Sequence, residues 1–433
     1  MSMLRLAQEV GSTSYVDKPK YVIRYVGTQL KTAQHALHYL PKFWRAAEMG
    51  LRSCLVCSSP PADPRWLDPL LEIGTKIVYL PRPKRNFDLG CVWRAYRLCR
   101  SLEAGIFHCD NMHTSPLMGA ALAGVPVRLW TKHSMQPCFE AARTPNLRDR
   151  IALSVRTSCT LATRVLAVSS AVRNELLAMG VPPERVMVVR NSINDCDLVR
   201  SERGAARRAL GLAESDFVFS AVGRSAHVKG WDVLIRAFEP IARVYPHTKL
   251  LLAGDTTSAA ERAHFVEMER LMDRFGVRDR IVLTGYLTEL ADVWGATDIF
   301  VMPSRSEGDS NALIEALCTG QPCIATRVGS AGDLIRDGEN GLLVEREDDV
   351  GLSAAMQRLV SEPELRRRLS EANRGVRLAP TIEAYAHKMV DIYADLLRDV
   401  TGRELRRAKV TASISTMVGM AAAAVEDLAA ALA

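Results

Sequence analysis

The feature that most constrains the fold of this chain is a regular alternation between short apolar runs and longer amphipathic segments. Such runs are typical of strands buried in a parallel sheet, and the segments between them have helical periodicity. The alternation therefore predicts an α/β fold, with helices covering both faces of mostly parallel sheets. The predicted strands are 21–26, 53–58, 76–80, 106–109, 127–131, 165–169 and 186–189, then 217–222, 248–253, 281–285, 298–302, 322–326 and 341–344.

Two series of strands and helices, separated by the polar segment 194–213, indicate two domains. The length of 433 residues suits this number, at about two hundred residues for each domain. We place the first domain at 1–200 and the second at 212–380, and assign 381–433 to C-terminal helices and an alanine-rich tail. The tail, 411–433, fits an oligomer contact, a membrane-surface helix or a frayed end, so the oligomeric state stays open.

The segment 306–316 places Glu307 in a loop and Glu315 in the helix that follows. A strand–loop–helix–strand unit presents ligands at the carboxyl ends of parallel strands, and the N–H groups near Ser310 and Asn311 suit a phosphate. The two carboxylates suit hydroxyls that donate hydrogen bonds, such as those of a sugar and a ribose. The pattern alone also fits an acidic residue that complements the helix dipole and a second, solvated Glu.

A second loop, 223–230, follows the predicted strand 217–222 and carries Arg224 and Lys229. A guanidinium and an ammonium in a glycine-flanked loop form a plausible clamp for a diphosphate. A solvated basic loop is the alternative for this segment taken alone. Two such loops in one alternating strand–helix domain are together a more specific signal than either loop.

At these residues the sequence resembles the retaining, nucleotide-sugar-dependent glycosyltransferases of family 4. The resemblance covers 223–343 most closely and includes the Glu-x7-Glu pair. It implies the GT-B fold, in which two Rossmann-like doubly wound domains face a cleft and the last long helix packs back on the first domain. It also implies a hexosyltransferase-like enzyme, with cell-surface polysaccharide or lipopolysaccharide synthesis as its setting. The further matching segments are 252–255, 282–286, 320–326 and 337–343.

The resemblance also implies roles for donor-binding residues. Arg224 and Lys229 would hold the donor diphosphate, Glu307 would contact the transferred sugar, and Glu315 would contact the ribose hydroxyls. The backbone between the two glutamates would meet the sugar and the phosphates; it comprises Gly308, Asp309, Ser310 and Asn311. Because family members often carry Phe or a small residue at 309 and Pro near 310, the donor sugar stays open.

Two further residues of the first domain acquire roles through the resemblance. His133 follows the predicted strand 127–131 and would touch the donor sugar, so the expected catalytic residues are His133 and Glu307. A histidine hydrogen-bonded inside the domain interface is the alternative. Gly27 follows the first strand and would lie in the loop that approaches the donor phosphates. One glycine stands here where two are usual, which fits a bulkier loop near the acceptor.

The sequence contains one literal DxD pair, Asp195 and Asp197, the pattern that holds a divalent metal in other glycosyltransferases. It falls at the end of the first domain, where the family usually reads Asn-Gly-Val-Asp, so we expect no metal there. Without a metal, Arg224, Lys229 and the helix N–H groups must stabilise the leaving diphosphate. No cofactor is expected besides the nucleotide-diphosphate sugar that serves as donor.

Other classes of function fit the sequence less well. A glycosidase needs two carboxylates that face one bond, whereas Glu307 and Glu315 lie in one loop–helix unit. A Rossmann oxidoreductase needs Gly-x-Gly-x-x-Gly after a strand, and no strand is followed by it. The remaining alternative is a non-catalytic nucleotide-sugar-binding or scaffold protein of the same fold. The donor nucleotide, the acceptor and the linkage stay open.

The charge is unevenly distributed along the chain. Residues 1–200 carry 27 Lys and Arg against 15 Asp and Glu, a net +12, whereas the whole chain carries +7. A basic first half suits an anionic membrane surface or a phosphate-bearing acceptor, and a solvated basic surface is the alternative. Nucleic acid is not expected as a partner, because stacking aromatics are not interleaved with the basic residues.

The cysteines and the N-terminus bear on localisation. Ten cysteines without paired spacing suit a reducing cytoplasm, and Cys54 and Cys57 lie in an apolar run that indicates buried thiols, with a redox or metal pair as the alternative. The first residues lack a signal-peptide core, and no apolar run is long enough to span a bilayer. We therefore expect a cytoplasmic protein, peripheral on the inner face of the membrane.

Overall fold

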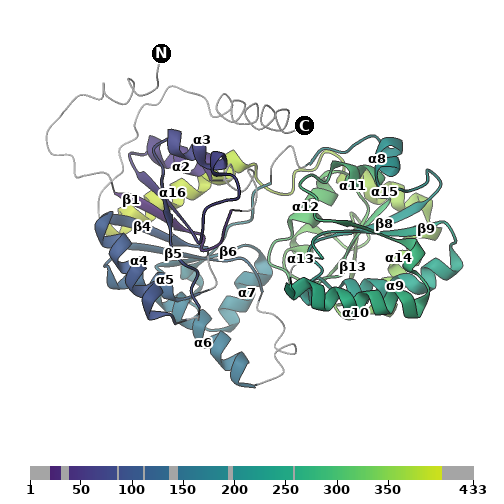
Figure 1. Cartoon of the computed structure of the whole chain (residues 1–433), viewed down its shortest axis with the longest axis horizontal. Coiled ribbons are helices and arrows are strands. Elements are labelled where there is room, and N and C mark those ends of the chain that lie inside the picture. Colours follow the sequence, from purple (N-terminus) through teal and green to yellow (C-terminus); the bar gives the residue numbers. More distant parts are fainter. Residues whose placement is uncertain are drawn as a thin grey trace, which may run out of the picture. The chain divides into compact units, whose positions relative to one another are not determined.

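The computed structural model describes residues 20–30, 39–84, 87–110, 113–135, 145–193, 198–256 and 259–401. It contains two parallel sheets flanked by helices (Figure 1). Each of the thirteen predicted strands is present, with ends within two residues of the prediction. The alternating α/β interpretation is therefore confirmed.

The strand order in the first sheet is β3-β2-β1-β4-β5-β6-β7, and that in the second is β10-β9-β8-β11-β12-β13. The first-sheet strands are β1 (Tyr21–Tyr25), β2 (Arg52–Cys57), β3 (Lys76–Tyr79), β4 (Ala104–Cys109), β5 (Val127–Lys132), β6 (Arg164–Ala167) and β7 (Val186–Val188). The second-sheet strands are β8 (Phe217–Val222), β9 (Thr248–Ala253), β10 (Ile281–Gly285), β11 (Ile299–Met302), β12 (Cys323–Thr326) and β13 (Leu342–Val344).

Helices connect these strands. Those up to the second sheet are α2 (Leu40–Glu48), α3 (Asp68–Glu72), α4 (Leu89–Ser101), α5 (Ser115–Leu122), α6 (Pro145–Leu161), α7 (Ser170–Ala178) and α8 (Arg203–Ala209). Those that follow are α9 (Trp231–Val244), α10 (Ala259–Phe275), α11 (Ala291–Ala296), α12 (Asn311–Cys318), α13 (Ala331–Leu334), α14 (Asp349–Ser361), α15 (Pro363–Asn373) and α16 (Ile382–Thr401). Short 3-10 turns lie at η2 (Pro64–Leu67), η3 (Pro183–Arg185), η5 (His227–Lys229) and η6 (Arg278–Arg280).

The second sheet is buried on both faces, because successive side chains of a strand point to opposite sides. Phe219, Leu250 and Leu252 belong to one apolar cluster, together with side chains of α9, α10, α14 and α15. Val218 and Leu251 belong to another, together with side chains of α8, α11, α12 and α13. This two-sided burial explains why the strands read as continuous apolar runs in the sequence.

The strand order places a topological switch point in each sheet. In the second sheet, β8 lies between β9 and β11, so the connections that leave β8 and β11 diverge to opposite sides. Ligands of open α/β sheets bind outside the carboxyl ends of the strands at this point. The loops 223–230 and 303–310 follow β8 and β11, so both predicted ligand loops lie at the switch point.

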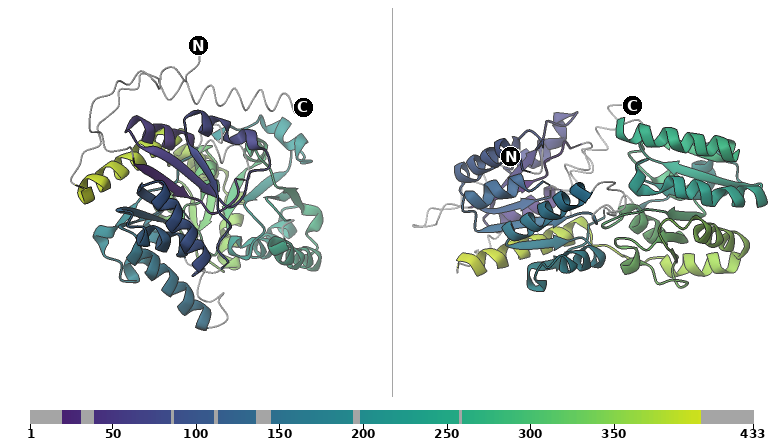
Figure 2. Two further views of the ribbon diagram at one scale, coloured as in Figure 1. Left: turned by 60° about the vertical axis from the view of Figure 1, so that its left-hand side comes forward. Right: turned by 90° about the horizontal axis from the view of Figure 1, so that it is seen from below.

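Two compact units divide the chain. One comprises 1–109, 115–128 and 389–433, and the other comprises 110–114 and 129–388 (Figure 2 gives two further views of the ribbon). This division does not test the domain boundaries predicted near 200 and 212, which stay a prediction.

Residues 198–213, the described part of the polar segment 194–213, are packed structure. They contain α8, whose Ala206 is buried together with Leu212 in the apolar cluster around Trp294. Arg207 of the same helix is fully buried and donates to the carbonyl oxygens of three residues that precede β8. Segment 198–213 thus belongs to the core that supports the second sheet.

The last helix, α16, packs in the first unit through a buried polar contact. The hydroxyl of Tyr393 lies 2.6 Å from Nδ1 of His108 on β4 and accepts a hydrogen bond of 3.3 Å from Arg24 on β1. All three side chains are buried. Because a buried polar group without a partner is costly, this cluster fixes α16 against β1 and β4. The part of 381–433 after residue 401 lies outside the described residues.

The described cysteines are free thiols, and most are buried. Burial raises the pKa of Cys54 and of Cys57 to about 12, so both thiols are neutral at physiological pH. Within the described ranges, none of the helices combines the length and the apolar character that a bilayer crossing requires.

Candidate active site

The loop after β8 is shaped by glycine. It runs from Gly223 through the exposed Arg224 and the turn η5 to Gly230, where α9 begins. Gly230 has φ +67°, and a Cβ at this position would overlap the carbonyl oxygen of Pro303. Only glycine accepts both the left-handed conformation and this approach. The loop after β8 therefore lies directly against the loop after β11.

Backbone and side-chain contacts join the two loops. The N–H of Arg305 donates to the carbonyl oxygen of Val228 at 2.8 Å. The ammonium of Lys229 forms an ion pair with the carboxylate of Glu307, and Ser304 Oγ donates to the same carboxylate oxygen at 3.2 Å. Two residues predicted to bind the donor, 78 positions apart, are therefore in contact.

A buried guanidinium holds the loop after β11 in place. Arg305 donates to both carboxylate oxygens of Asp232 in the first turn of α9, each at 2.7 Å, and to the carbonyl oxygen of His227 at 2.7 Å. It also pairs with the carboxylate of Glu347. Burial alone would raise the pKa of Asp232, but the hydrogen bonds and charge of Arg305, with the charges of Arg236 and His264, lower it to about 2.

This pair makes the stability of the second unit depend on pH. Because folding lowers the pKa of Asp232 from 3.8 to about 2, its contribution is present above about pH 4 and is lost as the pH falls towards 2. We expect Asp232→Asn to reduce the free energy of unfolding by about 2 kcal/mol at pH 7. Urea unfolding between pH 7 and pH 3 should also show that the free energy of unfolding falls less steeply with pH in this variant than in the parent. The exposed carboxylate change Glu339→Gln is the control, and equal slopes in all three proteins would contradict the assignment.

The N-terminus of α12 has backbone groups that can bind an anion. Ser310 caps the helix, with its Oγ accepting from the N–H of Leu313 at 3.4 Å, and its own N–H donates to Ser330 Oγ at 3.2 Å. Within the described residues, no hydrogen bond engages the N–H groups of Asn311 and Ala312. These first-turn groups and the helix dipole favour a negatively charged ligand. Glu315 lies in the second turn and is buried.

The side chain of Asp309 is engaged by other residues of the protein. Its fully buried carboxylate accepts from Arg190 at 2.6 Å and from the backbone N–H of Asn191 at 2.8 Å. The Asn191 amide also donates to the Asp309 carbonyl oxygen at 3.2 Å and to Asn311 Oδ1 at 3.3 Å. These bonds tie the loop after β11 to the segment that follows β7. Only the backbone of Asp309 remains available for the predicted contact with sugar and phosphates.

The loop after β5 lies against the same site. Ser134 and Gly308 form an antiparallel bridge, and the N–H of Met135 donates to the Glu307 carbonyl oxygen at 3.2 Å. A Cβ at Gly308 would overlap the carbonyl oxygen of His133. This packing alone requires glycine at 308, so the residue type there is no sign of donor contact. The exposed His133 ring lies 3.4 Å from the carboxylate of Asp110.

The predicted donor contact of Gly27 and the expected absence of a metal at Asp195 and Asp197 stay predictions. Gly27 belongs to the other compact unit, in the turn after β1, with φ +65° and its N–H donating to the Val56 carbonyl oxygen at 3.3 Å. Asp195 and Asp197 lie outside the described residues. Among the residues that are described, no three or more His, Cys, Asp or Glu side chains are grouped so as to hold a metal ion.

Several residues of the site were missed by the sequence analysis. They are Asp110, Arg190, Asn191, Asp232 and Arg305, and each supports a predicted residue or its loop. Of these residues, only Asp232 stands at a recognisable position, as an acidic residue in the first turn of a predicted helix. Acidic residues are so common there that the position gives no indication of function.

The chain matches known families over most of its length. The sequence model of the family described as Glycosyl transferases group 1 matches residues 202–376, and that of Glycosyltransferase Family 4 matches residues 44–195. The first match contains both loops of the site, and the second contains His133, Arg190 and Asn191.

Individual relatives match parts of the chain. N-acetyl-alpha-D-glucosaminyl L-malate synthase of Bacillus anthracis is 28% identical over 54% of this chain and 60% of that protein. The lipopolysaccharide core biosynthesis glycosyltransferase LpsD of Rhizobium meliloti is 36% identical over 38% of this chain and 45% of that protein. The chain thus spans about half the length of these relatives.

The structure of Anabaena HepE in complex with UDP has a TM-score of 0.70 at 17% identity, covering 87% of this chain and 100% of that one. This likeness confirms the predicted GT-B fold class.

Proposed function

Because the chain belongs to the glycosyltransferases of family 4, whose sequence models match 44–195 and 202–376, we propose that it transfers a sugar from a nucleotide-diphosphate donor to an acceptor. The observation that carries this proposal is the contact between Lys229 and Glu307 at the switch point of the second sheet. A cation for the diphosphate and a carboxylate for the sugar stand side by side, next to the first turn of α12.

Donor binding would exchange one ionic partner for another. In the structure the Lys229 ammonium is paired with Glu307. A diphosphate carries more charge than one carboxylate, so it would draw Lys229 and the exposed Arg224 towards its oxygens. Glu307 would then accept a hydrogen bond from a hydroxyl of the transferred sugar, and Glu315 would accept from the ribose. His133, which lies beside the Glu307 loop, would contact the sugar from its other side.

The chemical step would break the bond between the anomeric carbon and the diphosphate oxygen, and join that carbon to an acceptor hydroxyl oxygen. Negative charge grows on the leaving diphosphate, and preorganised donors stabilise it more in the transition state than in the ground state. Lys229, Arg224 and the N–H groups of Asn311 and Ala312 would supply this stabilisation without a metal. The proposed outcome is retention of the anomeric configuration, as the family resemblance implies.

The proposed acceptor is a glycan or a lipid-linked glycan used in cell-surface polysaccharide synthesis. Support comes from LpsD, a relative named for lipopolysaccharide core biosynthesis, and from the basic first half of the chain. HepE binds UDP, which makes UDP-sugars the first donors to test.

The decisive experiment measures donor hydrolysis and transfer by the purified chain, after a thermal-shift screen of UDP-, GDP- and ADP-sugars. We expect Glu307→Ala to lower kcat about a hundredfold, since it removes a contact with the reacting sugar. Nucleotide-diphosphate binding, measured by calorimetry, should persist in this variant. The exposed Glu339→Ala is the matched control and should behave like the parent.

The same assay separates the alternatives. Turnover that survives excess chelator would support a metal-independent step, whereas loss on chelation with recovery in magnesium or manganese would overturn it. Tight nucleotide-sugar binding without turnover for every donor and acceptor would favour a non-catalytic binding protein. Unchanged kcat in Glu307→Ala would contradict the role given to that carboxylate.

A further inference from the structure

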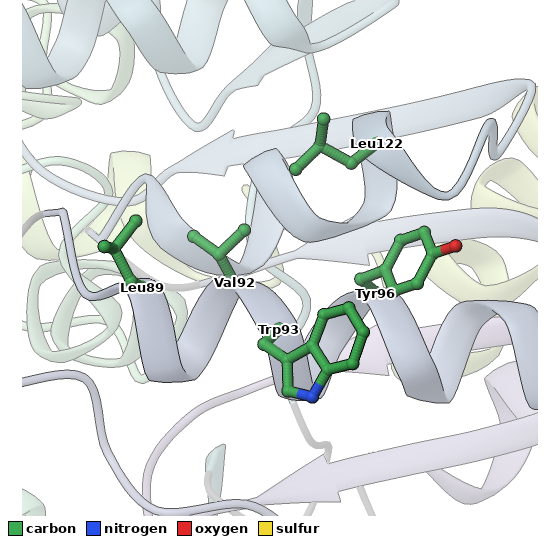
Figure 3. A pocket seen from close by; sticks show the side chains of 5 residues that line it. All are labelled: Leu89, Val92, Trp93, Tyr96 and Leu122. Atoms are coloured by element: carbon green, nitrogen blue, oxygen red, sulfur yellow. The ribbon is translucent and has the colours of Figure 1, made fainter.

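An exposed apolar groove lies in the first compact unit, outside the proposed active site. It has a volume of about 320 Å³ and is lined by Leu89, Val92, Trp93, Tyr96 and Leu122. Figure 3 shows four of these side chains along α4 and the fifth, Leu122, on the neighbouring helix α5. Leu89 is 81% exposed, Trp93 59% and Leu122 68%. Single exposed apolar residues are ordinary, but a contiguous group marks an interaction site.

The buried face of α4 does not include Leu89, Trp93 or Tyr96. Its buried residues are Cys91, Val92, Ala95 and Cys99. Trp93 and Tyr96 point outward instead, with their rings stacked at a centroid distance of 5.4 Å. A Trp and a Tyr with apolar bodies and polar tips are the side chains that favour the boundary between water and lipid.

The apolar groove is flanked by positive charge. Helix α4 carries Arg94, Arg97 and Arg100 and no acidic residue, and Arg97 and Arg100 are exposed. Exposed Arg82 and Lys84 precede the helix. The nearby Asp88 is engaged in capping, since its carboxylate accepts from the N–H groups of Lys84 and Cys91, each at 3.0 Å. The surface thus combines an apolar centre with cationic margins.

We propose that the outer surface of α4 and the end of α5 form the docking surface for an anionic lipid bilayer. Leu89, Trp93 and Leu122 enter the boundary between headgroups and acyl chains, and Arg97 and Arg100 contact the lipid phosphates. The inference deepens the proposed function, because a lipid-linked acceptor would be presented at that surface. It also gives a physical basis for a peripheral position on the inner face of the membrane.

Charge favours lipid over protein occupants. A second copy of the chain would bring the same arginines against one another, and like charges across an interface disfavour association. The C-terminal segment 402–433 carries four Lys and Arg against three Asp and Glu, so it offers no negative complement. An anionic bilayer supplies both the apolar phase and the opposite charge.

Sedimentation with vesicles tests the proposal on the full chain. We expect binding to phosphatidylglycerol-containing vesicles that weakens with salt, and little binding to phosphatidylcholine vesicles. Trp93→Gln combined with Leu122→Gln should reduce the partition coefficient at least tenfold, since both lose their apolar contribution. Leu71→Gln, a 51% exposed leucine of the same unit outside the groove, is the matched control and should bind like the parent.

A second pair of variants separates local from overall charge. Arg97→Gln with Arg100→Gln should lower the partition coefficient about twenty-five-fold at low salt, at roughly fivefold for each cation. Arg208→Gln with Arg336→Gln makes the same change in net charge at exposed positions elsewhere and should have little effect. Equal losses in the two pairs would overturn the proposed surface, because attachment would then follow net charge alone.

Fluorescence reports insertion directly. Trp93 is exposed, Trp66 is half-buried outside the groove, and Trp44, Trp130, Trp231 and Trp294 are buried, so brominated phosphatidylglycerol should quench mainly Trp93. Trp93→Phe should bind vesicles yet lose most of the quenching. Binding without any Trp93-dependent quenching would overturn insertion.

The result of the vesicle-binding experiments does not depend on whether the chain is a glycosyltransferase. Donor hydrolysis in solution needs no membrane, so groove variants should retain it. Undiminished vesicle binding in the groove variants would overturn this surface while leaving transferase activity untouched. Absence of vesicle binding, with a concentration-dependent dimer that Trp93→Gln abolishes, would assign the groove to a second copy and overturn the proposal.

Discussion

Replacing Gly308 with alanine is expected to lower turnover more than a hundredfold and to destabilise the chain by about 1–3 kcal/mol. The added Cβ would overlap the His133 carbonyl oxygen, lie 2.6 Å from its carbonyl carbon and lie 2.9 Å from Val168 Cγ2. Neither backbone segment can yield alone, because Ser134 and Met135 are hydrogen-bonded or bridged to the same loop. The loop between Glu307 and α12 must therefore shift, and the proposed sugar carboxylate shifts with it.

Gly332→Ala is the matched control for this change. Gly332 lies in α13 of the same domain, and nothing would lie within 4 Å of its added Cβ. We expect a neutral or slightly stabilising effect there, from the reduced entropy of the unfolded chain. Turnover, nucleotide binding by calorimetry and urea unfolding should be measured for both variants. Parent-like turnover in Gly308→Ala would show that the contact with the His133 segment is dispensable.

Replacing Arg207 with methionine is expected to reduce the free energy of unfolding by about 3–5 kcal/mol. Arg207 is fully buried, and its guanidinium donates to four carbonyl oxygens and to the carboxylate of Asp298 at 2.7 Å. Methionine has similar bulk but no donors, so those acceptors would stay buried without their partner. Asp298 also anchors β8, because it accepts from the Val218 N–H at 2.8 Å.

The neighbouring Arg208 provides the control. Its side chain is 69% exposed and lies 3.8 Å from Glu214, so Arg208→Met should change stability by less than about 0.5 kcal/mol. Denaturant unfolding of both variants, with the slope m compared to the parent, separates stability from a change in the unfolded state. Similar small effects of the two substitutions would mean that water replaces the buried guanidinium.

The two predictions concern different layers of the second unit. Arg207 supports the sheet from the side of α8, whereas Gly308 lets two loops meet at the carboxyl ends of the strands. The first should lower stability without moving the site, and the second should damage the site more than the fold. The ratio of turnover loss to stability loss therefore distinguishes them.

The sequence alone determined the fold class, the thirteen strands and the position of the two loops that are predicted to bind the donor. Strands buried on both faces must be apolar throughout, so 217–222 and 248–253 were recognisable without any knowledge of their neighbours. Loops after parallel strands all emerge at one edge of the sheet, so 223–230 and 306–311 could be assigned to the same edge. These properties follow from local periodicity and chain connectivity.

Only the tertiary structure decided which side chains are occupied by partners and which surface is left uncovered. Asp309 meets Arg190 from 119 positions away, Arg305 meets Asp232 from 73, and Gly308 is required by the backbone of His133. Trp93 and Leu122 are exposed in the fold. A side chain's partner depends on segments that folding brings together, and no local pattern of residues encodes that choice.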